Sequence, residues 1–324
     1  MKILVTGGHG LIGHQVVAAL QRNQHPVSVI DNHTNYGIIP RTEINYLLDQ
    51  RLKKLESHVH YNVDIADSKT TGSIITHEAP ELIVHLASFP RQKVVNSDPA
   101  AGSDVMMRGL INLLESAKKN HCKRFVYVSS SMVYGDFRDQ VNEDAVCQPQ
   151  GQYGIMKLAG EWLVKDYAAK TGMEFVILRP SAVYGPLDVE DRVIAKFMIA
   201  AMQNHVLKIN GPEEKLDFTY VSDAADGIVK SVELPQAAGH IFNITKSHSV
   251  SLLQAAEKIV SLVGKGHIEI RSRDLDFPSR GALNIDKARK ILNFNPAIDV
   301  DQGFKEYYQW LSNSSYWQHQ IKQC

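Results

Sequence analysis

The first thirteen residues, MKILVTGGHGLIG, restrict the fold of this chain more than any other stretch. Residues 2–5 are a short, apolar and β-branched run of the kind that forms a buried parallel strand. Gly7, Gly10 and Gly13 follow in the spacing G-x-x-G-x-x-G, and the apolar residues after them recur at helical spacing. The order of strand, glycine turn and helix predicts a nucleotide-binding βαβ unit, with a purely structural βαβ turn as the competing interpretation.

Two features of this unit predict which nucleotide binds. Glycines let the backbone approach a pyrophosphate, and the first helical turn, at Leu11 and Ile12, offers free N–H groups and a partial positive charge. A second apolar strand over 26–30 ends in Asp31, close to the interval of about 20 residues at which an acid binds the adenosine ribose hydroxyls. That carboxylate repels a 2′-phosphate, and the following residues, beginning with Asn32, include no arginine to bind one. The pattern therefore predicts NAD rather than NADP.

Composition excludes several classes of partner. The chain has 324 residues, 44% hydrophobic and 22% charged, and its 35 Lys and Arg balance its 35 Asp and Glu. There is thus no basic surplus that would favour nucleic acid or an anionic membrane surface. No stretch approaches the roughly 20 apolar residues of a membrane helix, and no signal segment is recognisable. The three cysteines, Cys122, Cys147 and Cys324, form no disulfide framework, and we expect a cytoplasmic protein.

Strand and helix patterns alternate through the first half of the chain. Apolar strand patterns occupy residues 59–63, 82–86, 124–128, 174–178 and 240–244, with helical patterns between the first four. Regular alternation predicts an α/β fold, a Rossmann-type doubly wound parallel sheet. We expect a nucleotide-binding domain over 1–180, completed by parts of 216–245, and a smaller, partly interleaved C-terminal substrate lobe over 181–324.

Two segments are predicted to be loops. Residues 32–48 exceed the usual length of a strand-to-helix connection, so we expect them to cover the adenosine or to reach a partner. Residues 89–96 follow the strand over 82–86 and place Arg91 and Lys93 close to the cleft.

The predicted chemistry rests on a tyrosine, a lysine and a serine. Tyr153 and Lys157 are four residues apart and share one face of a predicted helix. The serines at 129–131 follow the strand over 124–128. A nearby ammonium and a cationic nicotinamide ring favour phenolate, so we expect the pKa of Tyr153 to be lowered toward the working pH. Such a pair alone is more often a surface feature, but its place in a dinucleotide fold favours removal of a proton from a secondary alcohol while hydride passes to NAD.

Six segments, TGGHGLIG, HLAS, SSSMVYG, YGIMK, RPSAVYGP and LDFTYVSD, resemble the extended short-chain dehydrogenase/reductases, in particular the NAD-dependent nucleotide-sugar epimerases that include UDP-glucose 4-epimerase. The resemblance implies bound NAD and a catalytic triad of Ser130, Tyr153 and Lys157, with Ser129 or Ser131 as the serine if the register slips. Its positions also imply further cofactor contacts, at Asp64, Ile65, Leu86, Ala87, Ser88, Tyr153, Lys157 and Pro180.

Departures from the family pattern reduce the number of family reactions that fit this chain. The related 4,6-dehydratases place acidic residues just after the catalytic hydroxyl, whereas this chain has Ser131 and Met132, which disfavours dehydration. Epimerisation at C4 of a nucleotide diphosphate sugar needs no such acid. Ala182 and Leu216 also depart from the family, which leaves the sugar and the base open. The expected substrate contacts are Arg91, Ser131, Ser181, Arg192, Lys215 and Arg280.

Other interpretations remain open from the sequence. A nucleotide-sugar 4-dehydrogenase or reductase would use the same triad, and a non-catalytic NAD-binding sensor would use the same scaffold. None of the histidines, His9, His33, His58, His60 and His85 among them, shows a metal-ligand spacing, so no metal is predicted. The aromatic tail, from Tyr307 to Trp317, is expected to pack or to form an interface. The resemblance implies a homodimer formed through the helix of Tyr153 and its neighbour.

Overall fold

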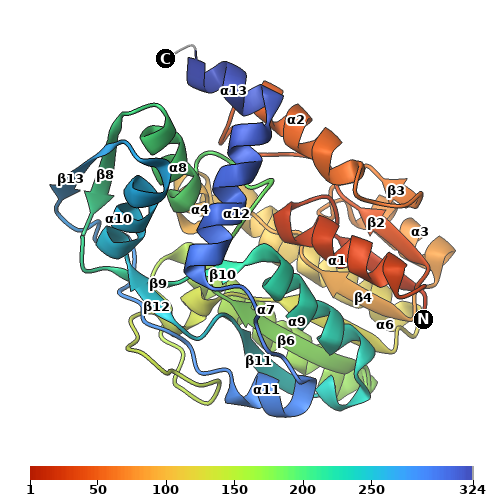
Figure 1. Cartoon of the computed structure of the whole chain (residues 1–324). Helices are drawn as coiled ribbons and strands as arrows, with labels where there is room; N and C mark the ends of the chain where they lie inside the picture. The colour runs from red at the N-terminus through yellow and green to blue at the C-terminus, as the bar shows by residue number, and fades with distance from the viewer. Residues whose placement is uncertain (323–324) are drawn as a thin grey trace.

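A seven-stranded parallel sheet forms the centre of the computed structural model, which describes residues 1–322 (Figure 1). Across the sheet the strands are β3 (Val59–Tyr61), β2 (Val27–Ile30), β1 (Ile3–Thr6), β4 (Leu82–His85), β5 (Arg124–Val128), β6 (Glu174–Pro180) and β11 (His240–Ile244). The strand order reverses at β1, because the chain first adds β2 and β3 on one side and then crosses to β4 on the other. This confirms the Rossmann-type doubly wound sheet, whose ligands bind where the order reverses.

Helices cover both faces of the sheet. One face packs against α1 (Leu11–Arg22), α9 (Val221–Glu233) and α11 (Asp286–Leu292), and the other against α3 (Ser68–Glu78), α6 (Gly109–Lys119) and α7 (Gln152–Thr171). Successive strand residues point to opposite faces, so Ile3 and Val5 enter the first core and Leu4 enters the second. Because both faces are covered, these strands are continuously apolar rather than alternating.

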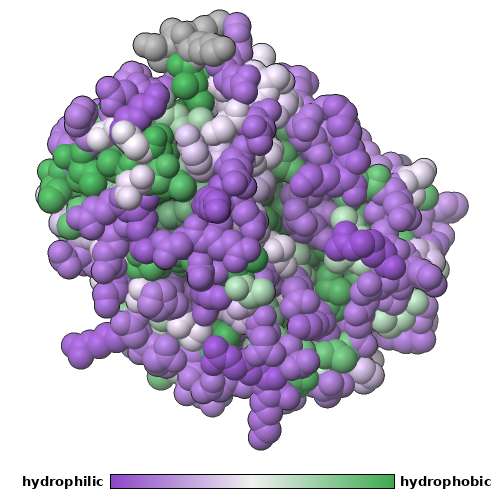
Figure 2. All heavy atoms as spheres, in the orientation of Figure 1, coloured by the Kyte–Doolittle hydropathy of each residue, from purple (hydrophilic) through white to green (hydrophobic). Residues whose placement is uncertain are grey.

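A smaller lobe has a hydrophobic core of its own. It contains α8 (Val193–Met202), α10 (Leu252–Val263), α12 (Val300–Asn313) and α13 (Ser315–Lys322) around the parallel pair β8 (Val206–Asn210) and β13 (His267–Arg271). Two short pairs accompany it: β9 (Lys215–Asp217) with β12 (Ser249–Ser251), and β7 (Val183–Tyr184) with β10 (Thr219–Tyr220). Tyr307 and Trp317 are buried in this core, which confirms packing for this part of the aromatic tail. Figure 2 shows hydrophobic side chains gathered on the surface over this lobe.

Both predicted loops contain helices that the sequence analysis missed. Within 32–48 the chain enters α2 (Arg41–Leu52) directly after Pro40. The buried positions of α2 are Glu43, Leu47 and Arg51, and because two of these are charged the helix has no apolar stripe to detect. The segment 89–96 contains most of α4 (Gln92–Ser97). The remaining helical pieces are α5 (Pro99–Ser103), a π-helical turn (Asp104–Arg108) and two 3₁₀ turns (Ser131–Tyr134 and Pro235–Ala237).

Cys122 and Cys147 are free thiols, and Cys324 lies outside the described residues. Among residues 1–322 there is no helix with the length and apolar character needed to cross a membrane.

Candidate active site

A cavity of about 1460 Å³ extends along the carboxyl ends of the central strands and under the smaller lobe. Every residue that the sequence analysis assigned to catalysis, NAD or substrate lines this cavity. The strands bring them together because Gly7 follows β1, Asp31 follows β2, Leu86 follows β4 and Ser129 follows β5. The cavity exceeds the roughly 300–1,000 Å³ of an ordinary small-molecule site and so has room for two large ligands.

The turn between β1 and α1 is shaped to receive phosphate groups. Gly7 has a φ of +71°, and a Cβ there would lie 2.7 Å from the backbone nitrogen of Ala87. A Cβ on Gly13 would lie 2.1 Å from the carbonyl oxygen of Gly7. Gly10 precedes α1 and provides no side-chain cap, so the N–H groups of the first helical turn are free to bind an anion. These residues fit the pyrophosphate of a dinucleotide.

Asp31 is held in position at the adenosine end of the cavity. Its two carboxylate oxygens accept hydrogen bonds from the backbone N–H groups of His9 (3.0 Å) and His33 (2.9 Å). Each oxygen retains a lone pair that can accept a ribose hydroxyl. Asn32 donates its side-chain N–H to Asp64 at 3.3 Å, which links the ends of β2 and β3 around the predicted adenine position. The residues at this end therefore fit the adenosine of NAD.

The three predicted catalytic residues meet at the carboxyl end of β5. The Ser130 hydroxyl caps the short turn after β5 by accepting from the Met132 N–H at 3.2 Å, and it is also hydrogen-bonded to Tyr153. Tyr153 and Lys157 lie on the same face of α7, with the Lys157 ammonium 5.9 Å from the Tyr153 ring centre. Lys157 is 4% exposed and donates to the Val128 carbonyl at 2.8 Å. The hydroxyl groups of Ser130 and Tyr153 can thus reach one substrate oxygen.

The pKa of Tyr153 departs from the expectation. Burial raises it above its ordinary value, while the positive charge of Arg192 and the hydrogen bond with Ser130 act in the opposite direction. The positive charge that lowers the pKa of Tyr153 thus comes from Arg192, whereas Lys157 was the residue expected to lower it. Burial also lowers the pKa of Lys157 to about 7, against the opposing charge of Glu161.

Glu161 is a buried positioning residue that the sequence analysis missed. It lies one turn beyond Lys157 on α7 and is fully buried. Its carboxylate forms a bidentate ion pair with Arg179 on β6, at 2.7 and 2.9 Å, and accepts from the Ser129 hydroxyl at 2.6 Å. The pair ties α7 to the ends of β5 and β6. The i, i+4, i+8 spacing of Tyr153, Lys157 and Glu161 was the available signal.

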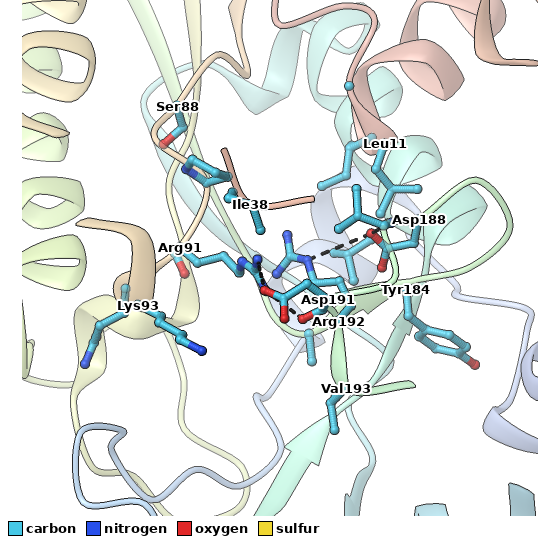
Figure 3. Close-up of a pocket in the computed structure, with 18 of the residues that line it drawn as sticks. Leu11, Ile38, Ser88, Arg91, Lys93, Tyr184, Asp188, Asp191, Arg192 and Val193 are labelled. Carbon is cyan, nitrogen blue, oxygen red and sulfur yellow. Dashed lines mark hydrogen bonds and ion pairs between the residues drawn. The ribbon is translucent and has the colours of Figure 1, made fainter. Parts of the chain in front are cut away.

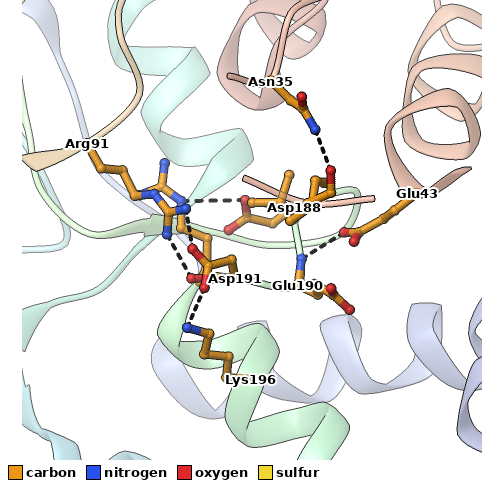
Figure 4. A network of polar contacts seen from close by, with 10 residues as sticks. Asn35, Glu43, Arg91, Asp188, Glu190, Asp191 and Lys196 are labelled. Carbon is orange, nitrogen blue, oxygen red and sulfur yellow. Dashed lines mark hydrogen bonds and ion pairs between the residues drawn. The ribbon is translucent and has the colours of Figure 1, made fainter. Parts of the chain in front are cut away.

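A network of charged side chains crosses the substrate end of the cavity. The Asp191 carboxylate accepts from Arg91 and also forms an ion pair with Lys196, so it bridges the segment after β4 and helix α8 (Figure 4). Figure 3 shows Arg91, Asp191 and Arg192 close together in this part of the cavity. Arg91 is therefore engaged by protein, and its second donor reaches the Asp191 carbonyl at 2.7 Å.

Several polar atoms at this end have no hydrogen-bond partner within the described residues. They are the Ser181 hydroxyl, the Nε atoms of Arg192 and Arg280, one carboxylate oxygen of Asp188 and the Gln92 side-chain oxygen. All five residues line the cavity. Because unpaired buried polar groups are costly, such a set indicates a place for a polar ligand. Ser131 and Lys215 also line the cavity, but Lys215 is half-exposed and pairs with Asp139 at 3.3 Å.

Comparison with known proteins gives a consistent result. A family model described as the NAD dependent epimerase/dehydratase family matches residues 3–245. An uncharacterized UDP-glucose epimerase of Bacillus subtilis is 30% identical over 322 residues, covering 97% of this chain and 98% of the relative. The dTDP-D-glucose 4,6-dehydratase of Bos taurus is 26% identical over 322 residues, covering 95% and 88%. The structure of Bacillus cereus UDP-glucuronic acid 4-epimerase, in complex with UDP-glucuronic acid and NAD, matches with a TM-score of 0.88 and 27% identity, over 100% of this chain and 99% of that chain.

Proposed function

Because this chain belongs to the NAD dependent epimerase/dehydratase family, we propose that it epimerises a nucleotide diphosphate sugar at C4. The observation that carries the proposal is the meeting of Ser130, Tyr153 and Lys157 beside a glycine turn shaped for a dinucleotide. The neighbouring Ser131 and Met132 supply no acid at the position where the resembling dehydratases carry one. This favours a reaction that returns the C4 oxygen to the alcohol and eliminates nothing.

The side chains divide the proton chemistry between them. Tyr153 acts as a phenolate, a form that the Lys157 ammonium and the cationic nicotinamide ring of bound NAD would favour; it takes the proton of the C4 hydroxyl as the alcohol becomes a ketone and returns it when the alcohol re-forms. Ser130 donates a hydrogen bond to the same oxygen, and Lys157 adds positive charge close to the Tyr153 ring. Bound NAD would accept the C4 hydride and return it to the other face of the sugar, which would invert C4 without net consumption of the cofactor.

The substrate end supports binding of a diphosphate. Arg280 carries an unpaired Nε donor and Ser181 an unpaired hydroxyl, while the Nε of Arg192 has no hydrogen bond and lies 3.9 Å from the Asp188 carboxylate. Guanidinium groups match phosphate oxygens in geometry as well as in charge. We assign the diphosphate to this group of donors and the sugar to the space between them and Ser130.

A homodimer is part of the same proposal. Ile155 and Trp162 on α7 are 52% and 62% exposed, and Ile111 on the adjacent helix α6 is 39% exposed. An exposed apolar face on two packed helices is typical of a contact surface between proteins. A second copy of the chain is the proposed partner.

The test is incubation of the purified protein with UDP-, GDP-, CDP- and dTDP-sugars, followed by chromatography of the sugars and absorbance of NADH. Formation of the C4 epimer without net NADH supports the proposal. Stoichiometric NADH formation or consumption would instead identify a 4-dehydrogenase or reductase. Absence of any product with every sugar would identify a binding protein on this scaffold.

A further inference from the structure

Four histidines that are scattered along the sequence gather beside Asp31. His9 comes from the glycine turn, His33 follows β2, and His58 and His60 flank the start of β3. The ring centres of His9, His33 and His60 are 4.5 to 5.1 Å apart in pairs. One nitrogen from each of these three rings lies within 4.8 Å of the other two. His9 is buried, with 2% of its surface exposed.

The hydrogen bonds assign the protons of the cluster. Nδ1 of His58 lies 2.8 Å from the carbonyl oxygen of Glu56, which can only accept, so that nitrogen carries the proton. In the neutral form of His58, Nε2 is an acceptor, and it receives the N–H at Nε2 of His9, 2.8 Å away. Nδ1 of His9 consequently has a free lone pair, and Nε2 of His33 donates to it at 2.8 Å. All three rings are neutral in this assignment.

The ring of His9 is buried and is enclosed by the rings of His33, His58 and His60. His60 also donates to a backbone carbonyl, but from its other nitrogen: Nε2 lies 3.0 Å from the Asp31 carbonyl oxygen, and in the neutral ring Nδ1 keeps its lone pair. Neutral imidazoles whose second nitrogen donates to a backbone carbonyl are the usual ligands of zinc and related ions.

We propose that His9, His33 and His60 bind one divalent transition metal ion of the Zn²⁺ class. The proton on Nε2 of His33, which now points at Nδ1 of His9, moves to Nδ1 of His33, and the ion occupies the position it leaves. No proton is lost, so the total charge of the rings does not change. Three neutral nitrogens leave a fourth position for water, and this donor set suits Zn²⁺, Ni²⁺ or Cu²⁺ rather than Mg²⁺ or Ca²⁺. The bound ion joins the glycine turn to the residues after β2 and to β3 itself, next to the carboxylate assigned to the adenosine ribose.

The test uses untagged, chelator-treated protein in excess NAD, titrated with ZnCl₂ by calorimetry and with CoCl₂ by visible absorbance. We expect one equivalent of ion, and a weakening of at least tenfold in His60→Ala and in His33→Gln, since loss of even an outer-shell partner typically costs about 10–100-fold. His77→Ala is the matched control, because His77 is exposed on α3. It should bind the ion as the wild type does.

The test includes two histidine variants and two checks of folding, so that a variant that fails to fold is not mistaken for one that fails to bind the ion. Circular dichroism and NAD content identify any variant that fails to fold, and either of the two histidine variants suffices for the comparison. Absence of binding by the wild type overturns the proposal. Equal affinity in wild type, His60→Ala and His33→Gln also overturns it, since the ion must then lie elsewhere. Because binding is measured directly, the result is independent of whether the enzyme proves to be an epimerase.

Discussion

Tyr153 lies beside Ser130, and burial keeps it protonated in the protein alone. Tyr153→Phe removes the hydroxyl and retains the ring, so turnover should fall by about 10²–10⁴-fold, the usual contribution of a general acid–base. NAD should remain bound, as measured by its release on denaturation. Tyr167→Phe, on the same helix but hydrogen-bonded to Glu115, is the control and should keep full activity. Unchanged turnover in Tyr153→Phe would remove this residue from the mechanism.

Arg280 has an unpaired Nε, and one of its terminal nitrogens donates to the sulfur of Met132 at 3.6 Å, which is a weak acceptor. Burial lowers its pKa to about 10, so it remains charged at neutral pH. Arg280→Met should therefore raise KM for the nucleotide sugar by about 10–100-fold with little change in kcat, the pattern of lost ground-state binding. Arg273→Met, which removes an exposed arginine paired with Glu214, should leave both constants unchanged. A fall in kcat at constant KM would contradict the diphosphate role.

Lys157 makes stability depend on pH, and the sign follows from its pKa. Burial lowers that pKa from 10.5 to about 7. Between these values the unfolded chain binds more protons than the folded protein, so this residue makes stability rise with pH across the interval. Below pH 7 both states carry the ammonium, and the cost of burying it is present in full.

Lys157→Met tests this linkage. The substitution removes the buried ammonium and also loses the hydrogen bond to Val128. We therefore expect the free energy of unfolding to rise by about 1–3 kcal/mol at pH 7, and this gain to shrink toward pH 10. Chemical denaturation at both pH values measures it. A variant less stable than wild type at pH 7, or a gain independent of pH, would contradict the effect of burial. The gain should accompany loss of activity.

At the scale of elements, the β1–α1 turn is expected to bind NAD only if the space beside Gly7 holds no side chain. Gly7 and Gly172 have nearly equal φ values, +71° and +74°, but a Cβ on Gly172 would meet nothing within 4 Å. Ala at either position should cost about 1–2 kcal/mol of backbone strain. Only Gly7→Ala, whose Cβ would lie 2.7 Å from the Ala87 nitrogen, should also lose NAD. Calorimetric NAD binding to both variants distinguishes strain from occupied space.

Helices and strands that bury apolar side chains could be predicted from the sequence, whereas a helix that buries polar side chains could not. The strands over 124–128 and 240–244 were predicted with the bounds that β5 and β11 have. Helix α2 was missed because it buries Glu43 and Arg51. Arg51 donates to the Leu187 carbonyl at 2.6 Å, and Glu43 accepts from the Glu190 N–H at 2.8 Å. These partners are more than 130 residues distant in sequence, and no local pattern indicates them.

At the scale of the whole molecule, the exposed face of α6 and α7 carries the proposed dimer. Trp162→Glu places a charge on that face and should weaken association by about 2 kcal/mol or more, about 30-fold in Kd. Light scattering during size-exclusion chromatography measures the mass across a dilution series. Val146→Glu, which makes the same change at a loop position that is 78% exposed, is the control. A wild-type monomer at every concentration would refute the dimer.

The sequence alone determined the doubly wound sheet and the preference for NAD, because both follow from short-range patterns: apolar runs, a glycine turn and an acid one strand later. It also named residues that all line one cavity, since residues after parallel strands meet at one edge. Only the tertiary structure decided that Glu161 supports helix α7, that Asp191 engages Arg91, and that His9, His33 and His60 converge. Those contacts join different elements, and their geometry depends on how the whole chain packs, which no local spacing records.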